Sequence, residues 1–278
     1  MTNPRSDRVR AVRALSGRSA RSRHGQYLVE GPQAVREAVR HARDLVRDLY
    51  VTPDSGRRYA EIVADARSAG LFLHVGTAEV LAAMSPDAQG VVAVVRAERP
   101  GLESALSAAS ARADGPLLVA VLAAVRDPGN AGTVIRAADA AGADLVVLAG
   151  ESVDVHNPKV VRSTAGSLFH VPVVSGVTLA ETAAVLRAAG LLLLAADGAG
   201  DHDLDDLLDV AGSGGVDLAR PTAWVFGNEA WGLPATDREL ADAVVRVPIR
   251  GRAESLNLAT AATVCLYASS RAHRGSPA

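Results

Sequence analysis

The chain has 278 residues, of which 49% are hydrophobic and 22% are charged, proportions typical of a globular protein with a substantial core. Its apolar runs have the length of strands rather than of membrane spans, and the N-terminus has no apolar signal segment. The single cysteine, Cys265, excludes an intramolecular disulfide and a cysteine-based zinc site. We therefore expect a cytoplasmic protein.

The net charge of −2 conceals an asymmetry along the chain. Residues 1–58 contain thirteen arginines and six acidic residues, so this end carries +7 and the remainder carries −9. Such an excess at one end is typical of a region that meets a polyanion such as a nucleic acid. An ordinary solvated surface is the alternative interpretation.

In chain order, the sequence predicts a basic arm, a small α/β domain, a linker and a larger α/β domain. Residues 1–25 are rich in arginine and form the arm. Residues 26–97 alternate short apolar segments with helix-patterned stretches, which predicts the small domain. Residues 98–116 have few large apolar side chains and are predicted to be the linker. Residues 117–271 form the larger domain, and residues 272–278 form a tail.

The larger domain is predicted to contain a parallel sheet, because its strand candidates alternate with helical patterns. These candidates are residues 117–125, 144–148, 171–174, 191–195, 223–226 and 244–247. Ligands of open α/β sheets usually bind beyond the carboxyl ends of the strands, so the loops that follow these strands are candidate sites.

The first candidate loop is the stretch VRDPGNAGTVIRAADAAGA, which follows the first of these strands. Residues 127–129 are predicted to form a turn, and a helix is predicted to begin near Asn130. Asn130 is also a good helix N-cap, which would be a purely structural role. Arg136 lies near the start of the same helix, and its position and charge suit an anionic substrate.

Two further loops carry polar residues directly after apolar strands. In AWVFGNEAWGLP, Glu229 follows a buried strand, so its carboxylate belongs either to the first turn of a helix or to a ligand site. In VPIRGRAESLNLATAA, Ser255 and Asn257 precede an apolar helix. Ser255 is the candidate N-cap, although Leu258 stands where a capping box has Glu or Gln.

These three loops, in this order and spacing, resemble the three motifs of the SpoU (TrmH) family of RNA ribose 2′-O-methyltransferases. NPKVVRSTAGSLFHVPV is similar to the segment that this family has after its first β/α unit, and QYLVEGPQAVREAV resembles the substrate-binding domain of rRNA-directed members. The resemblance implies a C-terminal Rossmann-like parallel sheet with a deep trefoil knot, the SPOUT class, beside a smaller N-terminal α/β domain.

The resemblance also implies a homodimer that binds S-adenosylmethionine in the knot. The positions that match the family's catalytic residues are Asn130, Arg136, Glu229, Ser255 and Asn257. The family's cofactor pocket maps to Ala196, Gly227, Val247, Ile249 and Leu256, and Arg162 is expected to contact RNA. Ala230 departs from the family's usual glycine, a departure that strains the loop if the position needs a positive φ. No metal and no membrane partner is expected.

In this interpretation Arg136 is not a base, because a guanidinium stays charged up to a pKa above about 12. It stabilises the developing alkoxide and orients a phosphate, while the other four polar residues hold it and the ribose in place. The expected substrate is 23S rRNA. The alternatives are tRNA or, in a different class, a non-catalytic RNA-binding protein. VRDPGNAG lacks the dinucleotide fingerprint that a Rossmann dehydrogenase needs, and no H-x-x-x-H metal motif is present.

Overall fold

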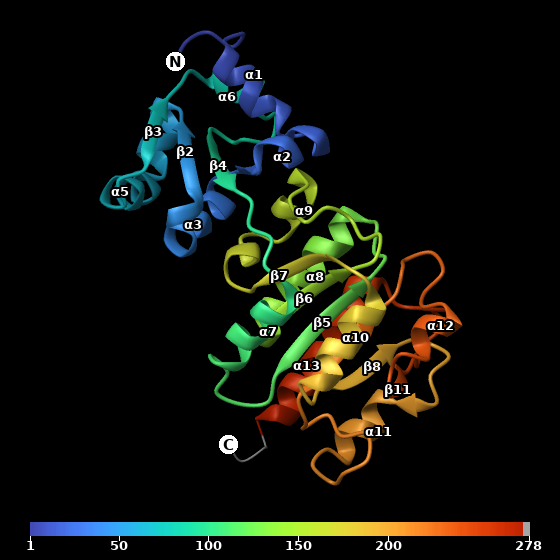
Figure 1. Cartoon of the computed structure of the whole chain (residues 1–278). Coiled ribbons are helices and arrows are strands. Elements are labelled where there is room, and N and C mark those ends of the chain that lie inside the picture. The colour runs from blue at the N-terminus through green and yellow to red at the C-terminus, as the bar shows by residue number, and fades with distance from the viewer. Residues whose placement is uncertain (275–278) are drawn as a thin grey trace. The chain divides into compact units, whose positions relative to one another are not determined.

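The computed structural model describes residues 1–274, and the chain divides into two compact units (Figure 1). The first unit consists of residues 1–98 and 154–170, and the second consists of residues 99–153 and the described residues from 171 onward. Among residues 1–274, no helix has both the length and the hydropathy that crossing a membrane requires. Residues 275–278 of the predicted tail lie outside the described residues, and Ala272 and His273 belong to the last helix.

The first unit is a four-stranded sheet with helices on both faces. Its strands are β1 (Gln26–Glu30), β2 (Val46–Val51), β3 (Phe72–Val75) and β4 (Val91–Arg96), in the order β1-β4-β2-β3. β4 is antiparallel to β1 and β2, whereas β2 and β3 are parallel. The helices before β4 are α1 (Asp7–Ala14), α2 (Arg18–His24), α3 (Pro32–His41), the short η1 (Arg43–Leu45), α4 (Pro53–Arg58), α5 (Ala60–Ser68) and α6 (Ala78–Met84).

The predicted basic arm is part of this unit rather than a free segment. Val9, Val12 and Leu15 are buried and pack with α6 against one face of the sheet. Their spacing places one apolar side of α1 on the core, while most of the arginines between them remain exposed. Composition alone predicted an arm because the arginines outnumber these few apolar anchors.

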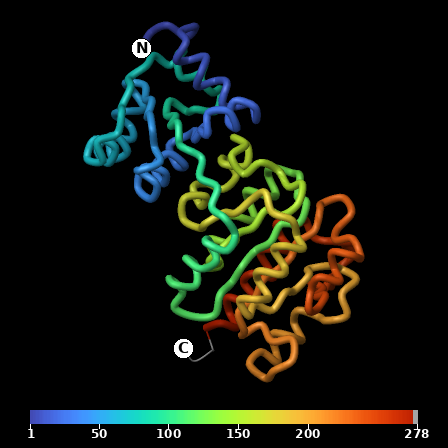
Figure 2. Tube along the Cα trace, viewed as in Figure 1, coloured from blue at the N-terminus to red at the C-terminus, as the bar shows by residue number. Residues whose placement is uncertain are grey.

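Residues 154–170 lie in the sequence between two stretches of the second unit, but they fold as part of the first unit (Figure 2). They form α9 (Pro158–Ser163) and the short helix η2 (Ser167–Phe169). Val161 is buried in the same core cluster as the β1 side chains, and Leu168 and Phe169 pack against that cluster. The sequence-predicted domain boundaries assign this segment to the larger domain, whereas its packing belongs to the smaller one.

The second unit contains a seven-stranded, fully parallel sheet, which confirms the predicted α/β class. The strand order is β7-β6-β5-β10-β8-β11-β9. The strands are β5 (Leu118–Ala123), β6 (Leu145–Ala149), β7 (Val173–Val177), β8 (Leu192–Ala196), β9 (His202–Asp203), β10 (Thr222–Phe226) and β11 (Ala243–Arg246). Six of them match the predicted strands, and the two-residue β9 was missed.

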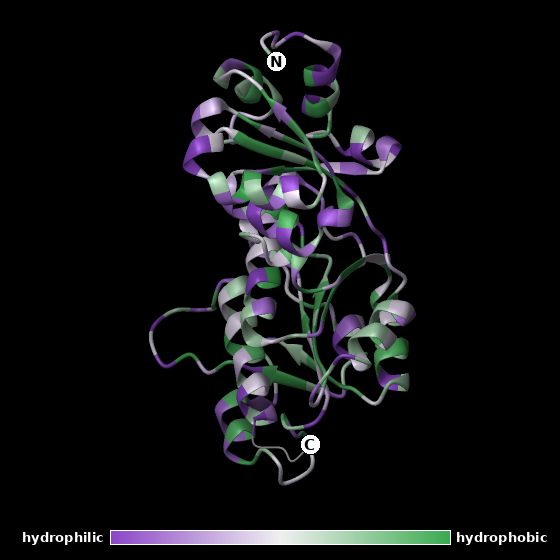
Figure 3. Ribbon diagram, turned by 90° about the vertical axis from the view of Figure 1, so that its left-hand side faces the viewer, coloured by the Kyte–Doolittle hydropathy of each residue, from purple (hydrophilic) through white to green (hydrophobic). Residues whose placement is uncertain are grey.

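Helices cover both faces of this sheet and bury its apolar strands. They are α7 (Leu102–Ser110), α8 (Pro128–Ala141), α10 (Leu179–Ala188), α11 (Leu204–Asp209), α12 (Ala235–Arg238) and α13 (Leu258–His273). α7 and α10 pack on one face and α8 and α13 on the other (Figure 1). Figure 3 shows the consequence: the strands of the sheet are largely hydrophobic, and the hydrophilic residues lie mainly on helices and loops.

The linker prediction is wrong for residues 102–110, which form α7. Leu102, Leu106 and Ala109 are buried in the core of the second unit. Their spacing of four and three residues is that of one helix face, but the many alanines and serines around them gave the segment a weak apolar signal.

Candidate functional site

The loops that follow β5 and β10 meet because these two strands are neighbours in the parallel sheet. From β5 the sheet continues through β6 and β7 in one direction. The later strands β8 to β11 are added on the opposite side of β5, so the strand order reverses at β5. Such a reversal is where open α/β sheets usually bind ligands. The candidate site is built at this edge of the sheet from the three predicted loops.

Glu229 connects the loop after β10 to the start of α8. Its two carboxylate oxygens accept hydrogen bonds from the backbone N–H groups of Arg126 and Asp127, at 3.3 and 3.1 Å, and from the side-chain amide of Asn130, at 3.3 Å. Glu229 is solvent-exposed and is not in the first turn of a helix of its own. A carboxylate beside the N-terminus of α8 is stabilised by the helix dipole and by these charge-assisted hydrogen bonds.

Asn130 then connects this pair of loops to the third. Its side-chain oxygen accepts a hydrogen bond of 3.0 Å from the Nδ2 group of Asn257. The structure therefore joins Glu229, Asn130 and Asn257 in one hydrogen-bonded chain, although they are up to 127 residues apart. The sequence motifs grouped these three residues in one site, and the hydrogen bonds show how they are connected.

The helix caps differ from those predicted. Asp127, not Asn130, caps α8 through a 2.7 Å hydrogen bond from the backbone N–H of Asn130. Asn257, not Ser255, caps α13 by accepting from the N–H groups of Ala259 and Thr260. Because Asp127 caps α8, the side-chain oxygen of Asn130 is not needed as a cap and can accept the hydrogen bond from Asn257.

A cavity of about 600 Å³ lies beside this chain of hydrogen bonds, beyond the carboxyl ends of β8, β10 and β11. Its lining includes all five residues predicted to bind the cofactor, which are Ala196, Gly227, Val247, Ile249 and Leu256. Asp197, Glu229 and Glu254 contribute carboxylates to its wall, and Arg238 contributes a guanidinium. The volume suits a drug-sized or cofactor-sized ligand, and the excess of carboxylates favours a ligand with positive charge.

Gly227 shapes one wall of this cavity. A Cβ atom at this position would lie 2.4–2.6 Å from the backbone of Gly232 and Leu233, so no side chain fits. The close approach closes a tight turn in which the backbones of Asn228 and Gly232 exchange hydrogen bonds of 3.0 and 2.9 Å. The turn brings Glu229 back toward α8.

Ala230 fits this turn without strain. It is not among the described residues with a positive φ, and its N–H donates to the side-chain oxygen of Asn228 at 2.8 Å. The positive φ of the turn is at Gly232, where φ is +66°. The replacement of the family's usual glycine by Ala230 therefore leaves the loop geometry intact.

Arg136 and Ser255 are not joined to the hydrogen-bonded chain. Arg136 is exposed on α8, six residues and therefore about 9 Å along the helix from Asn130, and it makes no hydrogen bond or ion pair within residues 1–274. Ser255 is exposed and lines the cavity. The guanidinium of Arg136 is thus available to an anion. Its action on the substrate stays a prediction.

An aromatic residue that was not predicted from the sequence, Trp231, lies at the mouth of the site. Trp231 lines the cavity with 55% of its surface exposed, and the Cζ atom of Arg126 lies 5.4 Å from the centre of its ring. An exposed tryptophan beneath a cation is a surface on which a nucleobase can stack. The signal was visible within FGNEAWGLP, since an exposed loop has little structural use for tryptophan.

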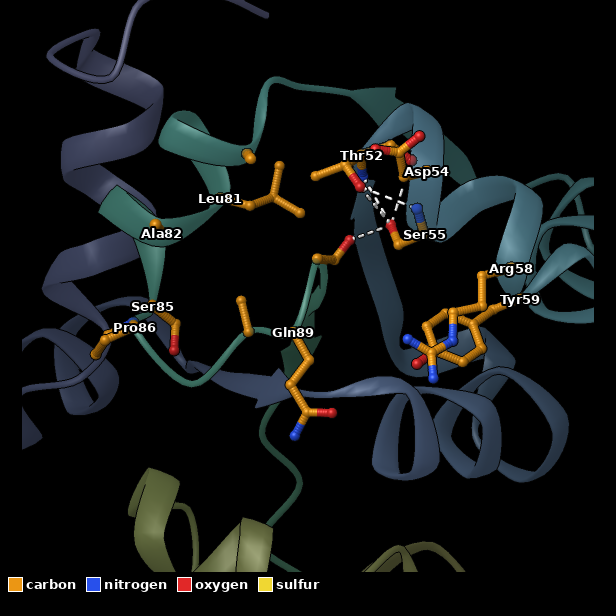
Figure 4. A pocket seen from close by; sticks show the side chains of 13 residues that line it. Thr52, Asp54, Ser55, Arg58, Tyr59, Leu81, Ala82, Ser85, Pro86 and Gln89 are labelled. Carbon is orange, nitrogen blue, oxygen red and sulfur yellow. Dashed lines mark hydrogen bonds between the residues drawn. The ribbon is translucent and has the colours of Figure 1, made fainter.

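A second cavity, of about 320 Å³, lies in the first unit between α4 and the segment from α6 to β4. Figure 4 shows the side chains of Arg58 and Tyr59 on one wall and those of Leu81 and Ala82 opposite, with Gln89 between them. The Cζ atom of Arg58 is 5.4 Å from the centre of the Tyr59 ring. Gln89 is exposed and has a φ of +48°, an uncommon and strained conformation for a residue with a side chain.

Arg162, predicted to contact RNA, lies in α9 of the first unit. Its NH1 group forms ion pairs with Glu30, whose side chain is only 4% exposed, and with Asp87. The Ser85 hydroxyl donates to the other oxygen of Glu30. Much of the charge of Arg162 is therefore compensated within the protein, although 43% of its side chain remains exposed.

Comparison with protein families gives two matches that together span most of the chain. The SpoU rRNA Methylase family matches residues 117–267. The family described as RNA 2′-O ribose methyltransferase substrate binding matches residues 28–101. The first match contains the hydrogen-bonded chain and the cavity beside it, and all but the last three residues of the second match belong to the first unit.

Comparison with individual proteins gives relatives of similar length. The chain is 34% identical to a 23S rRNA (uridine(2479)-2′-O)-methyltransferase of Streptomyces viridochromogenes, over 95% of this chain and 89% of the relative. It is 32% identical to a 23S rRNA (guanosine-2′-O-)-methyltransferase, RlmB, of Bordetella pertussis, over 89% and 98%. The solved structure of the SpoU methyltransferase AviRb of Streptomyces viridochromogenes with AdoMet aligns with a TM-score of 0.81, at 32% identity, over 98% of this chain and 100% of the other.

Proposed function

Because the chain belongs to the SpoU rRNA methylase family, we propose that it transfers a methyl group from S-adenosylmethionine to a ribose 2′-hydroxyl of 23S rRNA. The observation that carries this proposal is the hydrogen-bonded chain Glu229–Asn130–Asn257 beside a cavity lined by every predicted cofactor residue. The target nucleoside differs between the two rRNA-directed relatives, so the proposal does not extend to it.

The cavity fits S-adenosylmethionine in size and in charge. Gly227 lets the backbone of the turn form the wall, and the carboxylate of Glu254 favours the cationic sulfonium and amino groups of the cofactor, whereas Asp197 is paired with Arg238. When bound, S-adenosylmethionine supplies an electrophilic methyl group on a positively charged sulfur. The residues of the chain hold this group against the acceptor hydroxyl.

Arg136 contributes to the reaction by charge rather than by proton transfer. Its guanidinium is permanently protonated, so it stabilises the oxygen that becomes negative and orients the adjacent phosphate. Asn130, Glu229 and Asn257 form a rigid scaffold, because each is held by at least one hydrogen bond to another loop. Ser255 lines the cavity from the loop that precedes α13.

The trefoil knot, the homodimer and the cytoplasmic location are parts of the same proposal. The dimer interface is assigned to the solvent side of α13, where Val264 and Tyr267 are 40% and 49% exposed. Large exposed apolar side chains on one helix face are typical of association surfaces. Light scattering should show twice the chain mass, and Val264→Glu should reduce it to that of one chain; a monomer for the unmodified protein contradicts this assignment.

The cavity of the first unit is assigned to the RNA. Arg58 and Tyr59 offer a cation and a ring for stacking, and the Gln89 amide can donate and accept at the edge of an unpaired base. The strained backbone that presents Gln89 supports a functional role, because strain of this kind is concentrated at functional sites.

The test is methyl transfer from radiolabelled S-adenosylmethionine to 23S rRNA and, separately, to tRNA, followed by mass spectrometry of the ribose. Methylation of 23S rRNA at a 2′-oxygen is the expected result. Methylation of tRNA alone would overturn the substrate assignment. RNA binding without cofactor binding in calorimetry would instead identify a non-catalytic RNA-binding protein.

A further inference from the structure

A carboxylate and two imidazoles converge on one point of the first unit, and the proposed function uses none of the three. The Nε2 atom of His41 is 3.4 Å from Oε2 of Glu37, and the Nε2 atom of His170 is 3.2 Å from the same oxygen. One ligand atom from each of the three residues lies within 4.8 Å of the others. The two rings meet edge to face at an angle of 77°, with centres 4.7 Å apart.

These separations match those of a metal site. Zinc binds nitrogen and oxygen at about 2.0–2.1 Å in a tetrahedron, which separates neighbouring ligand atoms by roughly 3.3–3.4 Å. Glu37 and His41 are four residues apart on α3 and therefore project from the same face of the helix. His170 follows η2 and supplies the third ligand from the segment of residues 154–170.

The charge of Glu37 also favours a cation. Its side chain is only 21% exposed, and within residues 1–274 its ion-pair partners are the two histidines, with no lysine or arginine among them. Neutral imidazole is the commonest metal ligand in proteins, so a divalent ion would supply the positive charge that this carboxylate otherwise lacks.

The surrounding structure holds the three side chains in place. Gly166 has a φ of +106°, and a Cβ atom there would lie 2.5 Å from Cγ of Glu37, so the backbone of the segment presses directly on the carboxylate stem. Leu168 and Phe169 pack against the core of the first unit and fix the chain just before His170. Preformed ligands lose little conformational entropy on binding.

We propose that Glu37, His41 and His170 bind one zinc ion, which fastens residues 154–170 to α3. Three protein ligands leave the fourth position to water, which fits the 51% exposure of His41. The cluster contains a Glu-x-x-x-His pair rather than His-x-x-x-His, and its third ligand is 129 residues further along the chain, so no short sequence motif reveals it. The alternative is that both imidazoles donate hydrogen bonds to the carboxylate and bind no metal.

The experiment uses the tag-free, full-length protein after treatment with a chelator. Calorimetric titration with ZnCl₂ should give one site per chain, and zinc should raise the midpoint of thermal unfolding because it binds the folded state. MgCl₂ should do neither, since magnesium requires oxygen ligands. Co²⁺ should give the visible absorption of a tetrahedral site.

His41→Asn and His170→Asn each remove one ligand. Each should weaken zinc affinity by more than the roughly 10–100-fold that loss of an outer hydrogen-bond partner causes, and should abolish the zinc-dependent thermal shift. Glu37→Gln keeps the shape of the side chain and provides a second test if either histidine variant fails to fold. His24→Asn is the matched control, because His24 is exposed and has no side-chain hydrogen bond within the described residues.

Zinc binding that is absent from the unmodified protein, or that is equally strong in the ligand variants, overturns the proposal. The hydrogen-bonded alternative predicts a thermal midpoint that is insensitive to zinc. Because the readouts are metal binding and stability, they are independent of whether methyl transfer to rRNA is confirmed.

Discussion

At the scale of single residues, the candidate site contains side chains that fix its loops and a side chain that is available to the substrate. Glu229, Asn130 and Asn257 are engaged with one another, so their hydrogen-bonding capacity is largely used in fixing the loops. Arg136 has no such partner within the described chain and keeps all five of its N–H donors. An exposed, unengaged guanidinium on the helix that carries Asn130 is the arrangement expected of a residue that acts on the substrate.

Replacing Arg136 by alanine should abolish methyl transfer and leave the dissociation constant for S-adenosylmethionine within a few-fold, since Arg136 does not line the cofactor cavity. Arg136→Lys should fail nearly as badly, because a point charge does not reproduce a planar fork. Arg112→Ala, an exposed arginine beyond the amino end of β5, is the control. Turnover retained in Arg136→Ala would remove this residue from the mechanism.

Replacing Gly227 by alanine should lower cofactor affinity at least about fivefold, because the new methyl group must displace the backbone of Gly232 and overpacking of this kind costs roughly 1–3 kcal/mol. Gly115→Ala, at a position with open space for a Cβ atom, should leave affinity unchanged. Calorimetric titration of both proteins, after circular dichroism has shown that they are folded, checks the prediction. Equal affinities would place the cofactor elsewhere.

At the scale of elements, residues 154–170 depend on one largely buried ion pair. Arg21 is 5% exposed and donates to Asp154 at 2.7 and 3.0 Å while also binding the carbonyls of Leu15 and Ser16. Burial alone raises the pKa of Asp154, but the hydrogen bonds from Arg21 and His156 and the charge of Arg21 outweigh it, so this pKa is lowered.

Asp154→Asn should therefore destabilise the protein by about 2 kcal/mol at pH 7, since the buried guanidinium loses its charged partner and keeps only its carbonyl partners. A lowered folded-state pKa stabilises the protein above the unfolded value of about 3.9, and this contribution is lost as the pH falls through the folded-state pKa. The stability difference between the two proteins should therefore narrow below about pH 4.

Urea unfolding between pH 3 and pH 7 measures this difference. Asp65→Asn breaks the exposed pair with Arg40 and should cost at most about 1 kcal/mol throughout. A difference for Asp154→Asn that is independent of pH would show that the carboxylate's charge is not what Arg21 recognises.

The sequence predicted the strands well and the polar termini of the helices less well. Continuous apolar runs identified six of the seven strands of the second unit, because a strand buried on both faces has no polar side. β9 has two residues and no periodicity to detect. Asn130 and Ser255 were predicted as helix caps because their residue types permit it. The observed caps are Asp127 and Asn257, and residue type alone does not decide between neighbouring candidates.

At the scale of the whole molecule, the positive charge of residues 1–58 is distributed over folded helices. Arg13, Arg18 and Arg23 are exposed on or next to α1 and α2, and none forms an ion pair within residues 1–274. Uncompensated arginines that are fixed on a surface can neutralise RNA phosphates and release the counterions bound to them.

Replacing Arg13, Arg18 and Arg23 together by glutamine should reduce the slope of log affinity for RNA against log salt by about 2–3, at roughly 0.7–0.9 per lost phosphate contact. Arg36, Arg40 and Arg57 are already paired with acidic residues, so the same triple substitution there should change the slope much less. Filter binding over a range of salt concentrations measures both slopes. Equal changes in both would mean that only net charge matters.

The contribution of residues 154–170 to the first unit also has a consequence for folding during translation. The core of the first unit includes Val161, so this core is incomplete when residue 98 leaves the ribosome and is completed about seventy residues later. At roughly 5–20 residues per second, the nascent unit exposes apolar surface for about 4–14 s. During that interval β5 and β6 of the second unit are translated, so part of the second unit is synthesised before the first unit can finish folding.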